Sequence, residues 1–332
     1  MGGELKIVEE KLPGIYVIKV PLPGNPLKTL NSYYIRGGDR SLLVDTGFNR
    51  EECRTALFKG LESLGVSLVK TDIIITHLHA DHCGLVTAVA SDKNTVYCSE
   101  VDSKRINWSL SQNFWEEYFA FFGSYGFPVR DFSTALFKHP AQKYNLDREH
   151  DFSIVREGDV LEAGDYRLVI VETPGHTPGH ICLYEPDKKI LFSGDHILGN
   201  ITPNITMFYK GPPDPLDQYL QSLDKVDRLD IDLVLPGHRQ VIKDVHQRIA
   251  ELKRHYENRL IEVLVILGDR VMSTFQVASG IKWDLTYTSW DQFPMEQMLF
   301  ATGEAISYLE HLRHQQKVRR FEHDGHLLFE RI

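Results

Sequence analysis

A short stretch near residue 80 concentrates side chains that bind metal ions. Directly after the apolar run 73–75 come His77, His79, Asp81 and His82. In an extended loop, two histidines one residue apart can point the same way. Aspartate and neutral imidazole together suit Zn²⁺, Fe or Mn, and no cysteine is needed. A helix cap at Asp81 with incidental histidines is the alternative, but packing gives no reason for three histidines beside one carboxylate. The stretch therefore predicts a metal site.

The second half of the chain adds three more candidate ligands. Each follows an apolar, strand-like run, in the order His176, Asp195 and His238. They belong to the segments Pro-Gly-His, Ser-Gly-Asp and Pro-Gly-His. Any one of these segments alone is typical of an ordinary turn. Their joint occurrence at predicted strand ends indicates that they complete the site begun in the first half.

These residues, taken together, resemble the metal-binding signature of the metallo-β-lactamase superfamily. Asp45-Thr46-Gly47 matches another motif of that family, and the resemblance covers roughly residues 10–240. It implies an α/β fold, the four-layer αββα sandwich, and two metal ions. The implied ligands of one ion are His77, His79 and His176. Those of the other are Asp81, His82 and His238. Asp195 would bridge the two ions, and Asp45 would lie behind the ligands and orient them.

Such a ligand set predicts hydrolysis. Two divalent ions, with Zn²⁺ favoured and Fe or Mn possible, would lie about 3.5–4 Å apart and leave room for a bridging water. They would lower its pKa enough to give hydroxide at neutral pH. By resemblance, Asp81 would orient that nucleophile and carry its proton. Redox relatives of this fold usually have glutamate where His79 stands. Arg239 departs from the pattern, because many relatives have glycine after the last ligand.

The elements that must position these residues follow from hydrophobic periodicity. Strands are expected at 15–20, 31–35, 41–44, 73–75, 95–98, 166–171, 180–184, 189–192 and 232–235. Helices are expected at 51–64 and 217–229. We expect residues 1–242 to form the hydrolase domain, with a helical, aromatic-rich insertion at about 100–150. That insertion either packs on the domain or forms a lid over an apolar substrate cleft.

The C-terminal residues 243–332 have a different pattern. Helices are expected at 246–267, 273–280 and 294–314, followed by a hairpin at 317–331 around Asp324-Gly325. Three helices and a hairpin are the order of a winged helix. We expect a small, separate C-terminal domain that covers the cleft or builds a homodimer.

Composition limits the partners. The chain has 332 residues, a net charge of −9 and a pI near 5.9, which disfavours nucleic acid. No apolar run approaches the ~18 residues of a membrane span, and the first residues lack the apolar core of a signal peptide. The four scattered cysteines are typical of reduced thiols in a cytoplasm. Cys83, His180 and His196 are expected to be structural.

Three functions remain open from the sequence. The first is hydrolysis of a small carbonyl substrate, a thioester, ester or lactone, as in hydroxyacylglutathione hydrolases. The second is a phosphodiesterase or single-strand ribonuclease, favoured by the winged-helix-like order of the C-terminal residues. The third is a non-catalytic binding module, against which the complete ligand set argues. The sequence does not name the substrate, because one fold hosts many functions.

Overall fold

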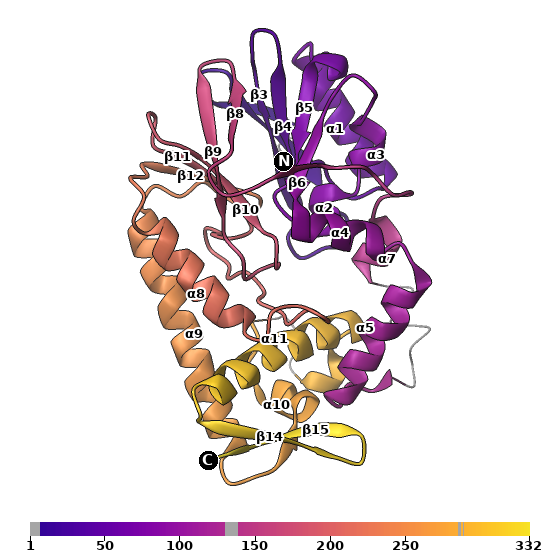
Figure 1. Ribbon diagram of the computed structural model, residues 1–332, viewed down its shortest axis with the longest axis vertical. Helices are drawn as coiled ribbons and strands as arrows, with labels where there is room; N and C mark the ends of the chain where they lie inside the picture. Colours follow the sequence, from indigo (N-terminus) through magenta and orange to yellow (C-terminus); the bar gives the residue numbers. More distant parts are fainter. Residues whose placement is uncertain (1–6, 130–138, 285–286, 288) are drawn as a thin grey trace, which may run out of the picture.

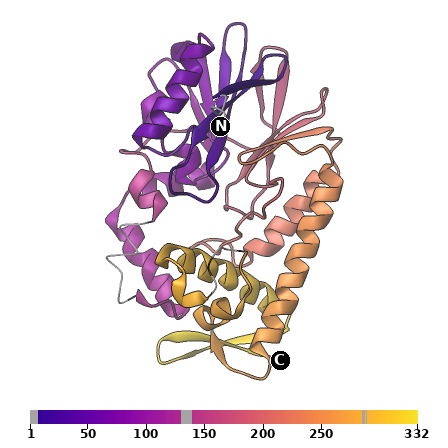
Figure 2. The ribbon, with the colours of Figure 1, turned by 180° about the vertical axis from the view of Figure 1, so that it is seen from behind.

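Two β-sheets lie face to face with helices on their outer sides (Figures 1 and 2). This computed structural model describes residues 7–129, 139–284, 287 and 289–332. The first sheet has the order β1 (Val8–Leu12), β2 (Ile15–Pro21), β3 (Thr29–Ile35), β4 (Ser41–Val44), β5 (Thr71–Ile74), β6 (Val96–Ser99) and β7 (Ser153–Val155). The second has the order β12 (Leu233–Pro236), β11 (Ile190–Gly194), β10 (Ile181–Glu185), β9 (Tyr166–Glu172) and β8 (Val160–Ala163). The predicted αββα sandwich is confirmed.

Alternation along the strands builds two cores at once. In β2, Ile15 and Val17 belong to the core between the two sheets, while Ile18 and Val20 belong to the core beneath the outer helices. The helices over that core are α1 (Glu51–Ser63) and α3 (Val86–Val89) on the first sheet, while α8 (Pro215–Val226) and α9 (Val245–Leu267) pack in a separate core beside the second. Buried on both faces, the strands hold the loops at their ends in fixed places.

The strand directions gather the candidate ligands at one end of the sandwich. Strands β4, β5 and β6 are parallel, and so are β11 and β12. Carboxyl ends of parallel strands meet at one edge of a sheet, where ligands bind in open α/β folds. The loops after β4, β5, β11 and β12 therefore converge. The short helix α2 (Ala80–Cys83) begins within this edge.

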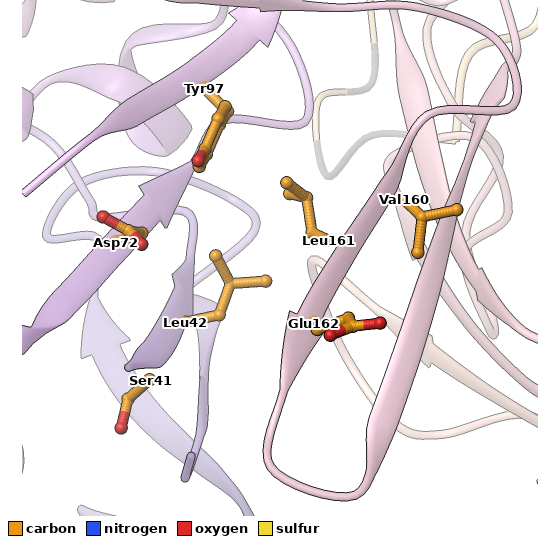
Figure 3. A pocket seen from close by; sticks show the side chains of 7 residues that line it. All are labelled: Ser41, Leu42, Asp72, Tyr97, Val160, Leu161 and Glu162. Carbon is orange, nitrogen blue, oxygen red and sulfur yellow. The ribbon is translucent and has the colours of Figure 1, made fainter. Parts of the chain in front are cut away.

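The opposite end of the sandwich is chemically different. A cavity of about 320 Å³ opens there between β4–β6 and β8 (Figure 3). It is lined by Ser41, Leu42, Asp72, Tyr97, Val160, Leu161 and Glu162. Its Asp72 is already paired with the Arg40 guanidinium. This end therefore joins the sheets and, among the described residues, offers no cluster of ligands.

The expected insertion consists of α4 (Glu100–Trp108), α5 (Gln112–Ser124) and α7 (Pro140–Tyr144), and residues 130–138 lie outside the described part. The aromatic side chains of α5 do not form a free surface. Phe119 and Phe122 are buried in the core that also holds Tyr308 and Phe329 of the C-terminal residues. Helix α5 thus packs on the C-terminal region, a partner that neither interpretation of the insertion named.

The C-terminal region follows the predicted element order. After α9 come β13 (Met272–Ser273), α10 (Thr274–Gly280), α11 (Met295–His314), β14 (Val318–His323) and β15 (His326–Arg331). The last two strands form the expected hairpin, and β13 adds a third strand beside β15. Helix α11 is buried on nearly all sides from Leu299 to Leu312, because α5, α8, α9, α10 and β14 surround it.

Two further observations bear on the sequence expectations. None of the described helices has the length and apolar composition that a membrane span needs.

All four cysteines are buried and free. Cys83 turns its thiol toward the Leu78 carbonyl and Asn145, so it packs as expected.

Candidate metal centre

Loops from both sheets bring the seven candidate ligands into one cluster, here called the His/Asp cluster. It comprises His77, His79, Asp81, His82, His176, Asp195 and His238. The first four follow β5, and the others follow β9, β11 and β12 in turn. All except His79 are buried. The structure therefore brings together every ligand that the sequence suggested.

One group within the cluster is formed by three imidazoles. His77 Nε2 lies 3.1 Å from His79 Nδ1. The His176 ring is 4.9 Å from that of His77 and 4.6 Å from that of His79. One nitrogen from each of these three rings lies within 4.8 Å of a nitrogen in each of the other two. Ligand atoms about 2.0–2.1 Å from a tetrahedral ion would be about 3.3 Å apart, so the group has the size of a metal site.

A second group contains a carboxylate and two imidazoles. His82 Nε2 and His238 Nε2 are 3.2 Å apart, and Asp81 Oδ2 is 3.3 Å from His238 Nε2. These contacts again match the edge of a coordination polyhedron. Asp195 lies between the groups. Its Oδ1 is 3.5 Å from His82 Nε2, while its Oδ2 is 3.7 Å from His176 Nε2. One carboxylate can thus reach both groups.

The outward ring nitrogens decide which nitrogens are free to bind metal. His176 Nδ1 donates to the carbonyl of Asn204 at 2.7 Å, and His238 Nδ1 donates to the carbonyl of Thr29 at 2.8 Å. A carbonyl only accepts, so each Nδ1 carries a proton and, in the neutral ring, each Nε2 keeps its lone pair. The rings are therefore held in the tautomer that a metal ion requires.

Asp45 occupies the place expected of an orienting residue. Its Oδ2 is 2.7 Å from His82 Nδ1. Its two oxygens also accept from the backbone N–H and the hydroxyl of Thr76, both at 2.9 Å. The Thr76 hydroxyl lies 3.0 Å from His77 Nδ1. Asp45 has φ of 60°, an uncommon value for a non-glycine residue. Asp45 thus holds one ring from each group, His82 directly and His77 through the Thr76 hydroxyl.

Close packing of the ligand loops requires a glycine at position 237. A Cβ there would lie 2.7 Å from Asp195 Oδ1 and 2.8 Å from the His82 ring. Any side chain would push apart two members of the His/Asp cluster. The Gly237 carbonyl also accepts from the Asn31 N–H, which ties this loop to β3. Two residues later, Arg239 has a φ of 65°, and its guanidinium donates to the Pro26 carbonyl.

The chemistry of the donor atoms fits a cation. His176 Nε2 and Asp195 Oδ1 are buried and have no hydrogen-bond partner among the described residues. Unpaired lone pairs in a buried site are costly unless a cation satisfies them. The donors are nitrogen and oxygen only, which suits Zn²⁺, Fe or Mn. The fold and this cluster can therefore bind metal.

The electrostatics place His79 and Asp81 in their metal-binding forms and favour a proton on His82. Burial, followed by neighbouring His176, lowers the pKa of His79 to about 3, so this ring is neutral. Burial opposes ionisation of Asp81, but His238 and His82 outweigh it and lower its pKa to about 2. Burial likewise opposes protonation of His82, yet Asp45 and Asp195 raise its pKa well above the usual value. A proton held there occupies the charge position that a metal ion would take.

A buried aspartate that the sequence did not suggest clamps two ligand loops together. Asp102 Oδ2 accepts from the Leu78 N–H at 3.0 Å and from the Thr177 hydroxyl at 2.6 Å. Its Oδ1 accepts from the Gly179 N–H at 2.8 Å. Burial raises the pKa of Asp102 to about 6, against these hydrogen bonds. Its position near the start of a helix gave no signal of this role.

The C-terminal region also reaches the cluster. Glu304 of α11 accepts from the Asn204 side chain at 2.9 Å, and the Asn204 carbonyl holds His176. Tyr308 donates to the other oxygen of Glu304. Burial raises the pKa of Glu304 to about 7. The sequence gave no sign of this chain of contacts, because it joins residues about one hundred positions apart through a backbone carbonyl.

The two histidines expected to be structural lie beside the cluster. His180 Nε2 accepts from the Asp195 N–H at 3.1 Å, and its Nδ1 lies 2.8 Å from the Thr173 hydroxyl. It therefore supports the Asp195 loop. His196 is fully buried against the Tyr219 ring, at 5.2 Å between ring centroids. Burial lowers its pKa to about 3, so it is neutral.

Comparison with known proteins agrees with the site. The model of the metallo-beta-lactamase superfamily matches residues 28–238, more than half of the chain. The chain therefore belongs to this superfamily, and it is a metallo-hydrolase by family. A probable metallo-hydrolase of Bacillus subtilis is 28% identical over 320 residues, 92% of this chain and 94% of that protein.

Two further likenesses are informative. The human acyl-coenzyme A thioesterase MBLAC2 is 26% identical over 220 residues, 63% of this chain and 72% of that protein. Among solved structures, a metallo-beta-lactamase family protein from Thermus thermophilus is 28% identical with a TM-score of 0.82. That likeness covers 97% of this chain and 99% of that one. It extends through the C-terminal region as well as the sandwich.

Proposed function

We propose that this chain is a dinuclear metal-dependent hydrolase that cleaves a thioester, within the broader class of small carbonyl substrates. The observation that carries the proposal is the His/Asp cluster, two ligand groups with Asp195 between them. His77, His79 and His176 would hold one ion. Asp81, His82 and His238 would hold the other, and Asp195 would bridge. Two bound cations would supply an ionised water as nucleophile and polarise the substrate carbonyl.

The residues of the chain then have separate tasks. Asp81 Oδ2 faces His238 Nε2, which leaves Oδ1 to orient the attacking water and accept its proton. Asp45 holds the His82 ring, and the Asn204 carbonyl holds the His176 ring. In four imidazoles of the cluster, Nδ1 already has a hydrogen-bond partner outside the cluster; these are His77, His82, His176 and His238. These rings therefore serve as metal ligands rather than as acids that protonate the leaving group. The site therefore favours a leaving group that departs without a proton.

A thioester meets that requirement. A thiol has a pKa near 8.5, so a thiolate leaves more readily than an alkoxide or an amide nitrogen. The human relative is named an acyl-coenzyme A thioesterase, which supports the same class. Esters and lactones, including substrates like those of hydroxyacylglutathione hydrolases, are weaker alternatives.

The phosphodiesterase or ribonuclease alternative has one observation in its favour. The order from α9 to β15, with a three-stranded sheet, is that of a winged helix. The charge distribution of the same region disfavours this alternative. Six lysines and arginines of this region pair with carboxylates, namely Arg248, Lys253, Arg259, Arg313, Arg319 and Arg320. A mixed surface attracts phosphate weakly, so we rank this function second.

Three finer points belong to the same proposal. Zn²⁺ is the favoured metal, because three- and four-coordinate nitrogen and oxygen sites suit it. Residues 243–332 form a winged-helix-like domain that covers the metal end or mediates a homodimer. A reducing compartment such as the cytoplasm fits the four free cysteines.

Metal content and a substrate screen test the proposal. Elemental analysis of undepleted protein should find about two metal ions per chain. One ion or fewer, unchanged after reconstitution, would contradict a dinuclear site. Metal-loaded protein should then hydrolyse thioesters faster than lactones and bis-p-nitrophenyl phosphate. Cleavage of the phosphodiester alone would reverse the ranking of the two functions.

A further inference from the structure

A second cavity lies along α4, against the loop that precedes α8. Its volume is about 450 Å³. It is lined by Glu100, Val101, Lys104, Arg105, Trp108 and Lys210. Three of these six side chains are cationic, and two are large and apolar. Such a mixture differs from the His/Asp cluster and points to an anionic ligand that also carries a flat or apolar part.

The cavity is connected to the His/Asp cluster through one aromatic ring. Phe208 stacks on the His79 ring, with centroids 6.4 Å apart. The Arg105 guanidinium lies 5.6 Å from the centroid of the same Phe208 ring. Arg105 also donates to the carbonyls of Tyr209 and Lys210, at 3.2 and 2.9 Å. The cavity therefore begins two contacts away from a proposed metal ligand.

The cations at its rim are held loosely. Lys104 pairs with Glu100 at 2.8 Å, and Lys210 pairs with Glu117 at 2.9 Å. Both lysine side chains are more than half exposed, at 73% and 57%. Exposed pairs of this kind contribute little. A phosphate group carries more charge than a carboxylate and accepts more hydrogen bonds, so it can compete for both ammonium groups.

The apolar wall can receive an aromatic base. Trp108 is half-buried, and the exposed side chain of Val101 lies on the same helix. The Lys210 ammonium is 5.1 Å from the Trp108 ring centroid and 4.9 Å from that of Tyr209. Aromatic side chains beside cations are the usual surface on which nucleotides bind without sequence readout.

We propose that this cavity binds the nucleotide end of a coenzyme A thioester. The purine would lie against Trp108 and Val101, and the phosphates would contact Lys104 and Lys210. The acyl end would then extend past Phe208 toward the His/Asp cluster. This inference rests on the proposed thioesterase function and names its substrate class. Nothing in the comparisons places a nucleotide at these residues.

Paired substrates separate the nucleotide site from the chemistry. An acyl-coenzyme A and the corresponding S-acyl-pantetheine share the thioester, but only the first has the nucleotide. For each variant, kcat/KM is measured on both, and their ratio is compared with that of the unaltered protein. Lys104→Ala and Lys210→Ala should each lower the ratio roughly five- to tenfold through KM, as one lost phosphate contact would. Lys59→Ala, an exposed lysine on α1, is the matched control.

A direct binding measurement covers the remaining outcomes. Adenosine 3′,5′-bisphosphate has the nucleotide but no thioester, so calorimetry with it measures nucleotide binding, and comparison with Lys210→Ala assigns that binding to the cavity rather than to the metal ions. Binding that weakens in Lys210→Ala and in raised salt supports the proposal. Unchanged substrate ratios in both lysine variants would overturn the nucleotide site while leaving a thioesterase. If neither thioester is hydrolysed, the proposed function fails, and absence of bisphosphate binding would then overturn the site too.

Discussion

The sandwich and the C-terminal region contribute to the same centre in different ways. All seven side chains of the His/Asp cluster come from loops of the sandwich, which rigid parallel strands hold in place. Among the described residues, the C-terminal region reaches the cluster through Glu304. Glu304 accepts from the Asn204 side chain, and the Asn204 carbonyl in turn holds His176. The contrast suggests that the first region determines whether chemistry occurs, and that the second adjusts how firmly one ligand is held.

The strongest test of the sandwich removes Asp195, the carboxylate that we propose bridges the two metal ions. Asp195→Ala should lower kcat at least about a hundredfold while the chain stays folded, because Asp195 contacts both ligand groups and carries no core packing. Steady-state kinetics and circular dichroism check this. Asp187→Ala, an exposed aspartate next to the same sheet, is the control. Retention of more than about a tenth of kcat would remove Asp195 from the bridging role.

A smaller effect is expected from the residue behind the ligands. Asp45→Ala removes the partner of the His82 ring and of Thr76, so metal affinity should fall about 10–100-fold, as for other orienting residues. Competition with a chelator measures this directly. The exposed Asp39→Ala serves as the comparison. Equal affinities for the two variants would mean that the Asp45 carboxylate does not orient the metal ligands.

A test of the C-terminal region uses pH. Burial raises the pKa of Glu304 to about 7, above its unfolded value of about 4.5, so the folded state holds the proton more tightly. Its stabilisation is present at low pH and is lost as pH rises from about 4.5 to 7. Glu304→Gln cannot ionise. Its free energy of unfolding should therefore rise by roughly 1–3 kcal/mol relative to that of the unaltered protein between about pH 5 and pH 8.

Urea unfolding at several pH values gives this difference. Glu257→Gln on the exposed face of α9 should show no such trend. A pH-independent difference between Glu304→Gln and the unaltered protein would mean that Glu304 is ionised throughout, held so by Asn204, Tyr308 and the nearby Arg259.

The last prediction is that single-stranded RNA does not bind. Single-stranded RNA should not bind the full chain at micromolar concentration near physiological salt, because the chain has a net charge of −9 and carboxylates lie among the basic residues of the C-terminal region. A salt titration of fluorescent RNA checks this. Micromolar binding that weakens steeply with salt, and is lost when Arg319 and Arg320 become alanine, would promote the ribonuclease function and redraw the comparison.

The sequence predicted the main strands and the candidate ligands because their signals are local, whereas the αββα sandwich was implied by the family resemblance. Apolar runs such as 73–75 mark buried strands, and a histidine or aspartate directly after one needs no long-range information. Strands β1, β7 and β8 were missed, since they are short and mostly exposed or half-buried, without clear alternation. Their pairing is decided by neighbouring strands rather than by their own residues.

The supporting residues were missed for a different reason. Asp102 and Glu304 lie inside helices, where a carboxylate normally faces water. Their partners are backbone groups or side chains far away in the sequence. Likewise the burial of α11 on all sides follows from five surrounding elements, which no periodicity within its own residues reveals. Such contacts exist only once the chain is folded.

The spread of the His/Asp cluster along the chain has a consequence for biosynthesis. Its side chains run from His77 to His238, and the Asn204 support depends on Glu304 still later. During translation, the ribosome releases the first ligands long before the last. A nascent chain can therefore offer only a partial, open binding site. Full loading with metal belongs to the finished polypeptide, after the second sheet has docked on the first.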